Sequence, residues 1–418
     1  MATTRSQAPA QQGARPSPSA RSQRALDWLN FFVADVQTGM GPFVTIYLTM
    51  HGWTRGAIGS VLTVGTIVQL VSQAPGGALV DWTHTKRAVI AFALGMIAAG
   101  SALIGLFPTY LPVVGGEVLH GLTGSVIKPA LAAIGLGLVG HRVFNERLGR
   151  NHRYDSFGNA LTAAAMGAMG YLVSRRAPFF VTVVLCLPAG YMLLRIRGDE
   201  VDYARARGAT GRREPKAARW RDLAKDRRIL VLAGCMVLFQ FADASVLMLA
   251  TERLASSFKH MSELVTSAMV VVPQLIAAVL ALRISRMAND RGRKPILIAG
   301  FAALLLRTGL FAFATAPWFL VLAQTLDGIT AAAIGVVQPL AIADMTKGTG
   351  RYNATLGAIG AANMAGASVS TTVIGFLAQR AGFTLGFGVL SLSALGGLAL
   401  LWWKLPETRD IALQEDPG

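Results

Sequence analysis

The feature that most constrains this chain is a succession of apolar stretches, each close to 20 residues long, separated by polar segments. A run of about 17–25 apolar residues can cross the ~30 Å hydrocarbon core of a bilayer as an α-helix. Helices of this length satisfy all their backbone hydrogen bonds within lipid. We therefore predict an all-α membrane protein. Twelve transmembrane helices are predicted, near residues 25–50, 56–80, 88–107, 110–139, 159–174, 177–194, 229–251, 264–282, 295–314, 317–343, 354–379 and 384–403.

Composition and charge placement support this prediction and give it an orientation. Charged residues make up 15% of the chain, against about 25% in soluble domains. With the N-terminus inside, 31 of the 39 Lys and Arg residues fall on the cytoplasmic side, 12 of them in residues 195–228. The outer loops hold Arg55, Arg175, Arg176, Arg253, Lys259 and Arg380. The positive-inside rule then places both termini in the cytoplasm of a bacterial-type inner membrane.

The net charge of +17 is explained by this orientation and by contact with the anionic headgroups of the lipid bilayer. No aromatic and basic module accompanies the charge, so nucleic acid is not expected as a partner.

The pattern divides the chain into five parts. Residues 1–24 are a predicted disordered cytoplasmic tail, because they are polar and lack an apolar core. Two six-helix bundles are expected at 25–194 and 229–404, joined by a basic cytoplasmic linker at 195–228. A second cytoplasmic tail follows at 405–418.

The two predicted bundles repeat each other in sequence at offsets of 198–210 residues. Five pairs of short matches occur in the same order. They are FFVAD (31–35) with FQFAD (239–243), DWTHTKR (81–87) with DRGRKP (290–295), LHGLT (119–123) with LDGIT (326–330), KP (128–129) with QP (338–339), and RNHRYD (150–155) with GTGRYN (348–353). Parallel repeats of six spans predict two bundles related by an axis along the membrane normal.

With these features the chain resembles the major facilitator superfamily from about residue 25 to 404. The motif that carries the resemblance is the turn between helices 2 and 3, Gly-x-Leu-x-Asp-Arg-x-Gly-Arg-Lys/Arg. The first copy, GGALVDWTHTKR, keeps Gly77, Leu79, Asp81 and Lys86 but has Trp82 and His84 in place of the Arg and Gly. The second copy, MANDRGRKP, keeps Asp290, Arg291, Gly292, Arg293 and Lys294.

The resemblance implies a function for this turn as well as a fold. In the family the Asp of the turn ties a helix end to the other bundle in the outward-facing state, which would make these residues a cytoplasmic gate. The alternative is that the turn is a basic loop that only sets orientation. The chain departs from the drug-antiporter pattern, since GNALTAAAMGAMGYLV has no proline and Glu117 stands where those antiporters have Arg.

Seven ionisable residues fall at membrane depth: Asp35, Glu117, His120, Lys128, Asp243, Arg307 and Asp327. Inserting one such residue into the bilayer centre costs at least about 2.5–3.5 kcal/mol, so ionisable residues at this depth usually face a cavity and serve a function. In the superfamily, helices 1, 4, 7 and 10 line the cavity, and Arg307 alone lies outside them. We predict that Asp35 and Asp243 face each other across the axis and exchange protons. The alternative is a structural role, as a helix cap or in a permanent pair with a cation such as Lys128.

The predicted halves differ at three cavity positions. Lys128 is matched by Gln338, so a single cation is available to neutralise a carboxylate or to hold an anionic substrate. Glu117 is matched by Gln324, and His120 by Asp327. These residues can relay protons or contact substrate, although a lone His is often a packing residue.

Arg153 and Arg351 each precede a Tyr and are predicted to begin helices 5 and 11 at the cytoplasmic face. They can pair with carboxylates of the other bundle as part of the gate. The alternative is that they extend to the lipid headgroups beside Tyr154 and Tyr352.

The sequence therefore predicts a secondary active transporter driven by an ion gradient. No Gly-x-x-x-x-Gly-Lys-Ser/Thr run occurs, no cofactor or metal site is expected, and no catalytic set indicates an enzyme. Proton-coupled export of a small organic molecule by alternating access is favoured. The alternatives are a proton symporter importing an organic anion held by Lys128, and a membrane receptor or scaffold that transports nothing. The resemblance implies a monomer.

Overall fold

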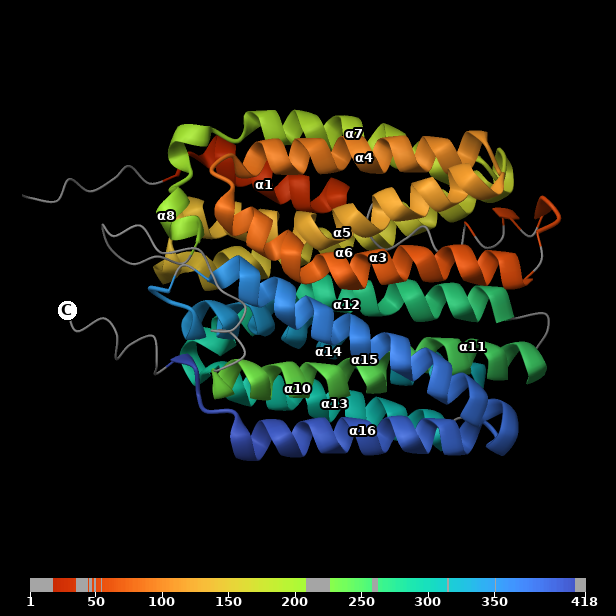
Figure 1. The fold of residues 1–418 in the computed structure, drawn as a ribbon. Helices are drawn as coiled ribbons and strands as arrows, with labels where there is room; N and C mark the ends of the chain where they lie inside the picture. The colour runs from red at the N-terminus through yellow and green to blue at the C-terminus, as the bar shows by residue number, and fades with distance from the viewer. Residues whose placement is uncertain are drawn as a thin grey trace, which may run out of the picture.

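The computed structural model describes most of the chain, and Asp35 lies outside the described part. The described residues are 18–34, 44, 47–48, 50–53, 55–207, 226–257, 262–313, 316–349 and 351–409. Within them the secondary structure is helical, and the long helices run side by side along one direction (Figure 1). The N-terminal half lies along one side of the molecule and the C-terminal half along the other (Figure 1).

The N-terminal half is built from long helices and ends in a short folded connector. Its helices are α1 (Ala20–Val33), α3 (Arg55–Trp82), α4 (Lys86–Leu106), α5 (Tyr110–Val139), α6 (His141–Leu172) and α7 (Ala177–Arg195). The connector holds a 3-10 turn η1 (Gly198–Glu200) and α8 (Tyr203–Ala206).

The C-terminal half repeats the same order. Its helices are α10 (Arg227–Ala244), α11 (Val246–Ser257), α12 (Ser262–Arg291), α13 (Arg293–Phe313), α14 (Pro317–Met345), α15 (Tyr352–Ala381) and α16 (Phe383–Lys404). The start of α1 and the ends of α7 and α16 lie at the same end of the molecule, which we call the linker side (Figure 1).

Membrane-spanning helices are confirmed as the main element of the fold. Within the described residues, nine helices are long and apolar enough to cross a bilayer. The three predicted spans not counted fall on α1, α3 and α6; α1 is described over only 14 residues, and α6 has a polar first half. The number of twelve stays a prediction.

The predicted helix at 159–174 is too short, because α6 begins at His141 and runs for 32 residues. A search for apolar stretches of about 20 residues does not find residues 141–158, because they are polar overall. They are nevertheless helical because Phe144 and Leu148, one turn apart, are buried against the C-terminal half.

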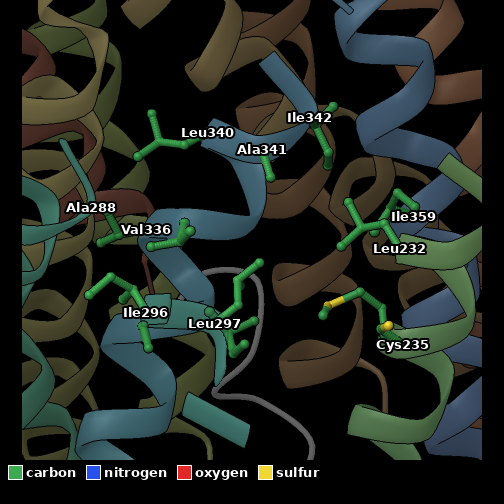
Figure 2. Close-up of a cluster of buried hydrophobic side chains, with 14 of the residues drawn as sticks. Leu232, Cys235, Ala288, Ile296, Leu297, Val336, Leu340, Ala341, Ile342 and Ile359 are labelled. Atoms are coloured by element: carbon green, nitrogen blue, oxygen red, sulfur yellow. The ribbon is translucent and has the colours of Figure 1, made fainter. Parts of the chain in front are cut away.

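The largest hydrophobic core joins the two halves. Phe144 and Leu148 of α6 pack with residues of α10, α12, α13, α14 and α15. Figure 2 shows part of this cluster, in which Leu232 and Cys235 of α10 lie opposite residues of α14 such as Ile342. Cys235 is a buried free thiol in this cluster. A second cluster fills the N-terminal half itself.

Two joints hold the halves together, one between α3 and α15 and one between α6 and α12. In the first, a Cβ on Gly77 would lie 2.3 Å from the Asn353 carbonyl oxygen, and one on Gly357 would lie 2.4 Å from the Gln73 carbonyl oxygen. In the second, a Cβ on Gly149 would lie 2.6 Å from Ser285 Cβ. Glycines at these points therefore allow the backbones of opposite halves to approach closely.

Candidate transport site

A cavity of about 660 Å³ lies between the two halves. Residues of α1, α3, α5 and α6 line it from one half, and residues of α10, α14 and α15 from the other. It brings together Lys128 and Gln338, as the sequence repeat predicts. The remaining described candidates, Glu117, His120, Asp243 and Asp327, are not among its lining residues.

The polar side chains in the lining of this cavity are mostly amides. Seven side chains carry amide groups: Asn30, Gln69, Gln73, Asn151, Gln240, Gln338 and Asn363. The titratable lining residues are Lys128, His152 and Asp155, and no Phe, Tyr or Trp is found among the lining residues that the structure describes. Each amide offers both donors and acceptors, so the cavity can form many neutral hydrogen bonds with a solute.

His152 and Asp155 are lining residues that sequence reasoning missed. The His152 ring on α6 sits against Gly335 of α14, where a Cβ would lie 2.5 Å from its Cε1 atom. The histidine therefore contacts the opposite half directly. The sequence does carry a signal for these two residues, since both belong to the repeated segment RNHRYD. Because this segment is polar, a search for apolar stretches does not predict that it belongs to α6.

Asp243 does not pair with Lys128. Its carboxylate forms an ion pair with Arg307 of α13, and the same guanidinium also binds Asp327 of α14. Arg307 is 2% exposed, whereas the two carboxylates are 29% and 26% exposed. One cation is thus shared by two anions, and the cluster carries a net charge of −1 when both carboxylates are ionised.

Gln324 extends this triad, because its amide donates a hydrogen bond to Asp327 Oδ2 at 3.3 Å. All of these residues belong to the C-terminal half. The structure therefore pairs Asp243 with Arg307, a cation of its own bundle that lies outside the four helices expected to line the cavity.

The equivalent region of the N-terminal half has different chemistry. Gly100 occupies the position of Arg307 at an offset of 207, and the His120 ring takes up the free space, with Nε2 3.1 Å from where a Gly100 Cβ would lie. His120 Nε2 is also 3.1 Å from Ser101 Oγ and 3.3 Å from the Ile97 carbonyl oxygen. His120 is thus hydrogen-bonded between α4 and α5, as expected for a packing residue.

Glu117 lies one turn away from His120 on α5, close to Gly65 of α3. Its Oε2 atom is 2.7 Å from where a Gly65 Cβ would lie. Within the described part of the chain it forms no ion pair. A carboxyl group in this setting is therefore a second candidate proton site, in the half that lacks the arginine.

At the linker side, Asp81 connects the two halves. Its carboxylate accepts hydrogen bonds from Asn353 Nδ2 at 2.6 Å and from the Ala354 backbone N–H at 2.7 Å. It therefore caps the N-terminus of α15, where the helix dipole favours a negative charge. We call this contact the Asp81 latch. Lys86 does not reach across: it is buried and donates to the Val80 and Thr83 carbonyl oxygens at the end of α3.

The second copy of the turn has different partners. Arg293, which begins α13 as Lys86 begins α4, donates to the Ala288 carbonyl oxygen at 2.8 Å and to Asp344 at 2.9 Å. Its link to the other half is a hydrogen bond of 3.5 Å to Asn145 Oδ1. Asp290 makes its described contact through its carbonyl oxygen, which accepts from Arg409. Its carboxylate therefore does not reproduce the Asp81 latch.

Gly292 shapes this second turn between α12 and α13. It has a φ of +98°, which disfavours any side chain. The Glu407 carboxylate lies directly over it and accepts from the Arg293 and Lys294 backbone N–H groups at 2.8 and 3.0 Å. Arg291 ends α12 beside it. The equivalent carboxylate in the first half, Glu200, accepts from Ser19 at the start of α1.

Arg153 and Arg351 are not equivalent. Arg351 directly precedes α15 as expected. Arg153 lies 12 residues inside α6, so the prediction that it begins helix 5 is wrong, because the polar segment before it is already helical. It lines a groove on the outside of the bundle.

An ion-pair cluster between α1 and α6 also escaped sequence analysis. Asp27 is 1% exposed and pairs with both Arg147 and Arg150. Arg147 also donates to Asn151 Oδ1 at 2.7 Å. Asp27 was visible as a charge within the first apolar stretch, but its partners lie in the polar part of α6 that was not predicted to be helical.

Comparison with known proteins agrees with this architecture. The family model of the Major Facilitator Superfamily matches residues 28–257 and 232–417. Uncharacterized MFS-type transporters of two Mycobacterium tuberculosis strains are each 38% identical over 396 residues, which cover 93% of this chain and 94% of the relative. The multidrug resistance protein MdtG of Dickeya zeae is 24% identical over 397 residues, covering 88% and 91%.

Two solved structures have a similar fold. The human organic anion transporter MFSD10 aligns with a TM-score of 0.71 at 15% identity and covers 91% of this chain and 99% of its own. The proton:xylose symporter XylE aligns with a TM-score of 0.69 at 16% identity and covers 93% and 95%.

Proposed function

The chain belongs to the major facilitator superfamily of membrane transporters, and on that premise we propose that it exports a small polar organic molecule in exchange for protons. The observation that carries the proposal is the amide-lined cavity between the two halves. The two halves would rock about this cavity and open it to each side of the membrane in turn.

The latch and the glycine joints support this alternating movement. The Asp81 latch joins α3 to α15, and its hydrogen bonds to Asn353 and Ala354 would have to break for the linker side to open. The large core around Phe144 would have to divide at the same time. We therefore assign the described conformation to a state that is closed at the linker side.

The cavity chemistry supports a polar solute. Its volume suits a small molecule, and seven amide side chains can pair with hydroxyl, amide or carbonyl groups of a solute. A hydrophobic cation would gain little there, because aromatic side chains that attract cations are missing from the described lining. Export is proposed because of the similarity to a multidrug resistance protein, although the cavity favours more polar cargo.

Proton coupling is supported by the triad in the C-terminal half. With one arginine between two carboxylates, the cluster becomes neutral when it takes up one proton. Neutralising a cluster lowers the cost of keeping it at membrane depth, so protonation would favour a conformation in which the triad is more enclosed. Asp243 and Asp327 are both partly exposed and can exchange a proton in the described conformation. Glu117 is the candidate in the other half.

We propose that the linker side is cytoplasmic, in an inner membrane, and that the protein acts as a monomer. The excess of Lys and Arg in the segments of that side supports the orientation. Twelve of these residues fall in the linker alone.

A second candidate is the import of an organic anion with protons. It is favoured by Lys128, the lysine that lines the cavity. A carboxylate substrate could form a charge-assisted hydrogen bond with its ammonium group, with the amides holding the rest of the molecule.

Solute exchange in proteoliposomes tests the function. The purified protein would be screened with a panel of polyols, sugars, nucleosides, amino acids, organic anions and hydrophobic cations. We expect exchange of a neutral polar solute, retained in Lys128→Gln and in the exposed control Lys404→Gln. Loss of binding and exchange in Lys128→Gln alone, with an organic anion as the active solute, would instead establish the second candidate. Absence of exchange with every class would contradict transport and favour a receptor or scaffold.

A further inference from the structure

Two adjoining hollows form one groove on the outer face of the molecule, between α6 of one half and α12 of the other. The larger, of about 520 Å³, is lined mainly by apolar and aromatic side chains, including Trp28, Phe157 and Leu161. The smaller, of about 370 Å³, is lined by Arg150, Arg153 and Arg286 together with Glu146. Arg153 and Tyr154 belong to both, so the two hollows are continuous.

This groove faces away from the central cavity. On α6, Leu148, Asn151, His152 and Asp155 line the cavity, whereas Phe157, Leu161 and Ala164 line the groove. At 100° per residue these two sets occupy opposite faces of one helix. The groove is also open to its surroundings, since Trp28, Leu161 and Leu275 are 44%, 61% and 42% exposed.

The groove has a charged end and an apolar end. On α12, Val271, Leu275, Leu282 and Arg286 form one stripe, with the arginine toward the linker side. On α6 the order is the same, from Glu146 and Arg150 to Leu161 and Ala164. From Arg153 to Ala164 the apolar part is about 16 Å long at 1.5 Å per residue, close to half of a ~30 Å hydrocarbon core.

Charge decides the chemistry of the occupant. Three arginines and one glutamate give the charged end a net charge of +2. Arg150 is partly neutralised by Asp27, whereas Arg153 and Arg286 form none of the ion pairs in the described structure. Guanidinium groups bind phosphate oxygens well, often through two hydrogen bonds.

We propose that this groove binds an anionic phospholipid from the leaflet at the linker side. The phosphate would lie between Arg153 and Arg286, and one acyl chain would fill the slot beside Trp28, Phe157 and Leu275. The lipid would contact α1 and α6 of one half and α12 of the other, beside the glycine joint at Gly149. Its binding is therefore coupled to the relative position of the two halves.

Lipid titration of the full-length protein in detergent, followed by native mass spectrometry, tests the proposal. The probes are phosphatidylglycerol and phosphatidylcholine with identical acyl chains. In Arg153→Gln/Arg286→Gln, phosphatidylglycerol affinity should fall roughly thirtyfold, with little change for phosphatidylcholine. Glu146→Gln should instead strengthen phosphatidylglycerol binding about fivefold, a gain that a misfolded variant would not produce.

Three controls separate lipid binding in this groove from non-specific binding elsewhere on the protein. Arg283→Gln, on an exposed part of α12 outside the groove, should bind like the wild type. Ala164→Trp fills the apolar slot and should weaken binding of both lipids. The headgroup fragment sn-glycerol 3-phosphate should not displace the lipid at equal concentration. Equal losses in Arg283→Gln, full binding in Ala164→Trp, or displacement by the fragment would each overturn the proposal.

Discussion

Neutralising Asp81 should shift the protein toward a state open at the linker side. The Asp81 carboxylate accepts two hydrogen bonds, at 2.6 and 2.7 Å, from the first turn of α15. Asparagine can keep one of them, but its amide nitrogen faces a donor and its charge no longer complements the helix dipole. Loss of one charge-assisted hydrogen bond and of the dipole interaction amounts to about 2 kcal/mol, or roughly a thirtyfold change in the equilibrium between the two states.

The assay is a distance measurement between spin labels on opposite halves at the linker side. Ala88 on α4 and Lys404 on α16 are exposed label positions, and both native cysteines are buried. Asp81→Asn should increase the population with the longer distance. The matched control is Asp290→Asn, the same change in the second copy of the turn, whose carboxylate binds no helix of the other half among the described residues. An unchanged distance distribution in Asp81→Asn, or equal shifts in both variants, would refute the reasoning.

Two further substitutions test the triad and the second turn. Arg307→Met should lower the free energy of unfolding by about 3–5 kcal/mol, because it leaves two carboxylates unpaired at membrane depth. Adding Asp327→Asn should restore part of this loss. Thermal unfolding in detergent measures both effects, and equal midpoints for Arg307→Met and wild type would contradict the assignment of the triad. Gly292→Ala should destabilise more than Gly52→Ala: both have positive φ, costing about 1–2 kcal/mol, but only Gly292 has the Glu407 carboxylate within 2.4 Å of the added Cβ. The same unfolding assay compares them, and equal losses would argue against steric contact with Glu407.

The fold was predictable from sequence because its signals are long and repeated. Hydrophobic stretches of membrane-spanning length, and five matches in the same order in both halves, are enough to predict helices in two similar halves. The start of α6 was not predictable from sequence, because residues 141–158 are polar. Their helix is stabilised by Phe144 and Leu148 against the other half, a tertiary contact that a local pattern does not contain.

The candidate site was predictable in part. Sequence identified Lys128 and Gln338, which the structure brings to one cavity. It also identified Asp243, Arg307 and Asp327 as charges at membrane depth, but not that they bind one another. The three residues lie on α10, α13 and α14, whose facing sides meet only in the folded bundle, so spacing along the chain gives no sign of the pairing. The family pattern for cavity helices left Arg307 aside, although it lies at the centre of the triad.

Proton movement that accompanies solute transport tests the central claim most directly. A pH-sensitive dye inside proteoliposomes would report proton flux when an active solute is added to wild type, Asp243→Asn, Asp327→Asn or the exposed control Asp199→Asn. Each triad variant keeps a neutral pair with Arg307, so the fold should be retained. We predict solute-dependent proton flux in wild type and Asp199→Asn, and its loss in both triad variants. Solute transport by wild type without proton flux, or undiminished flux in both triad variants, would contradict the account.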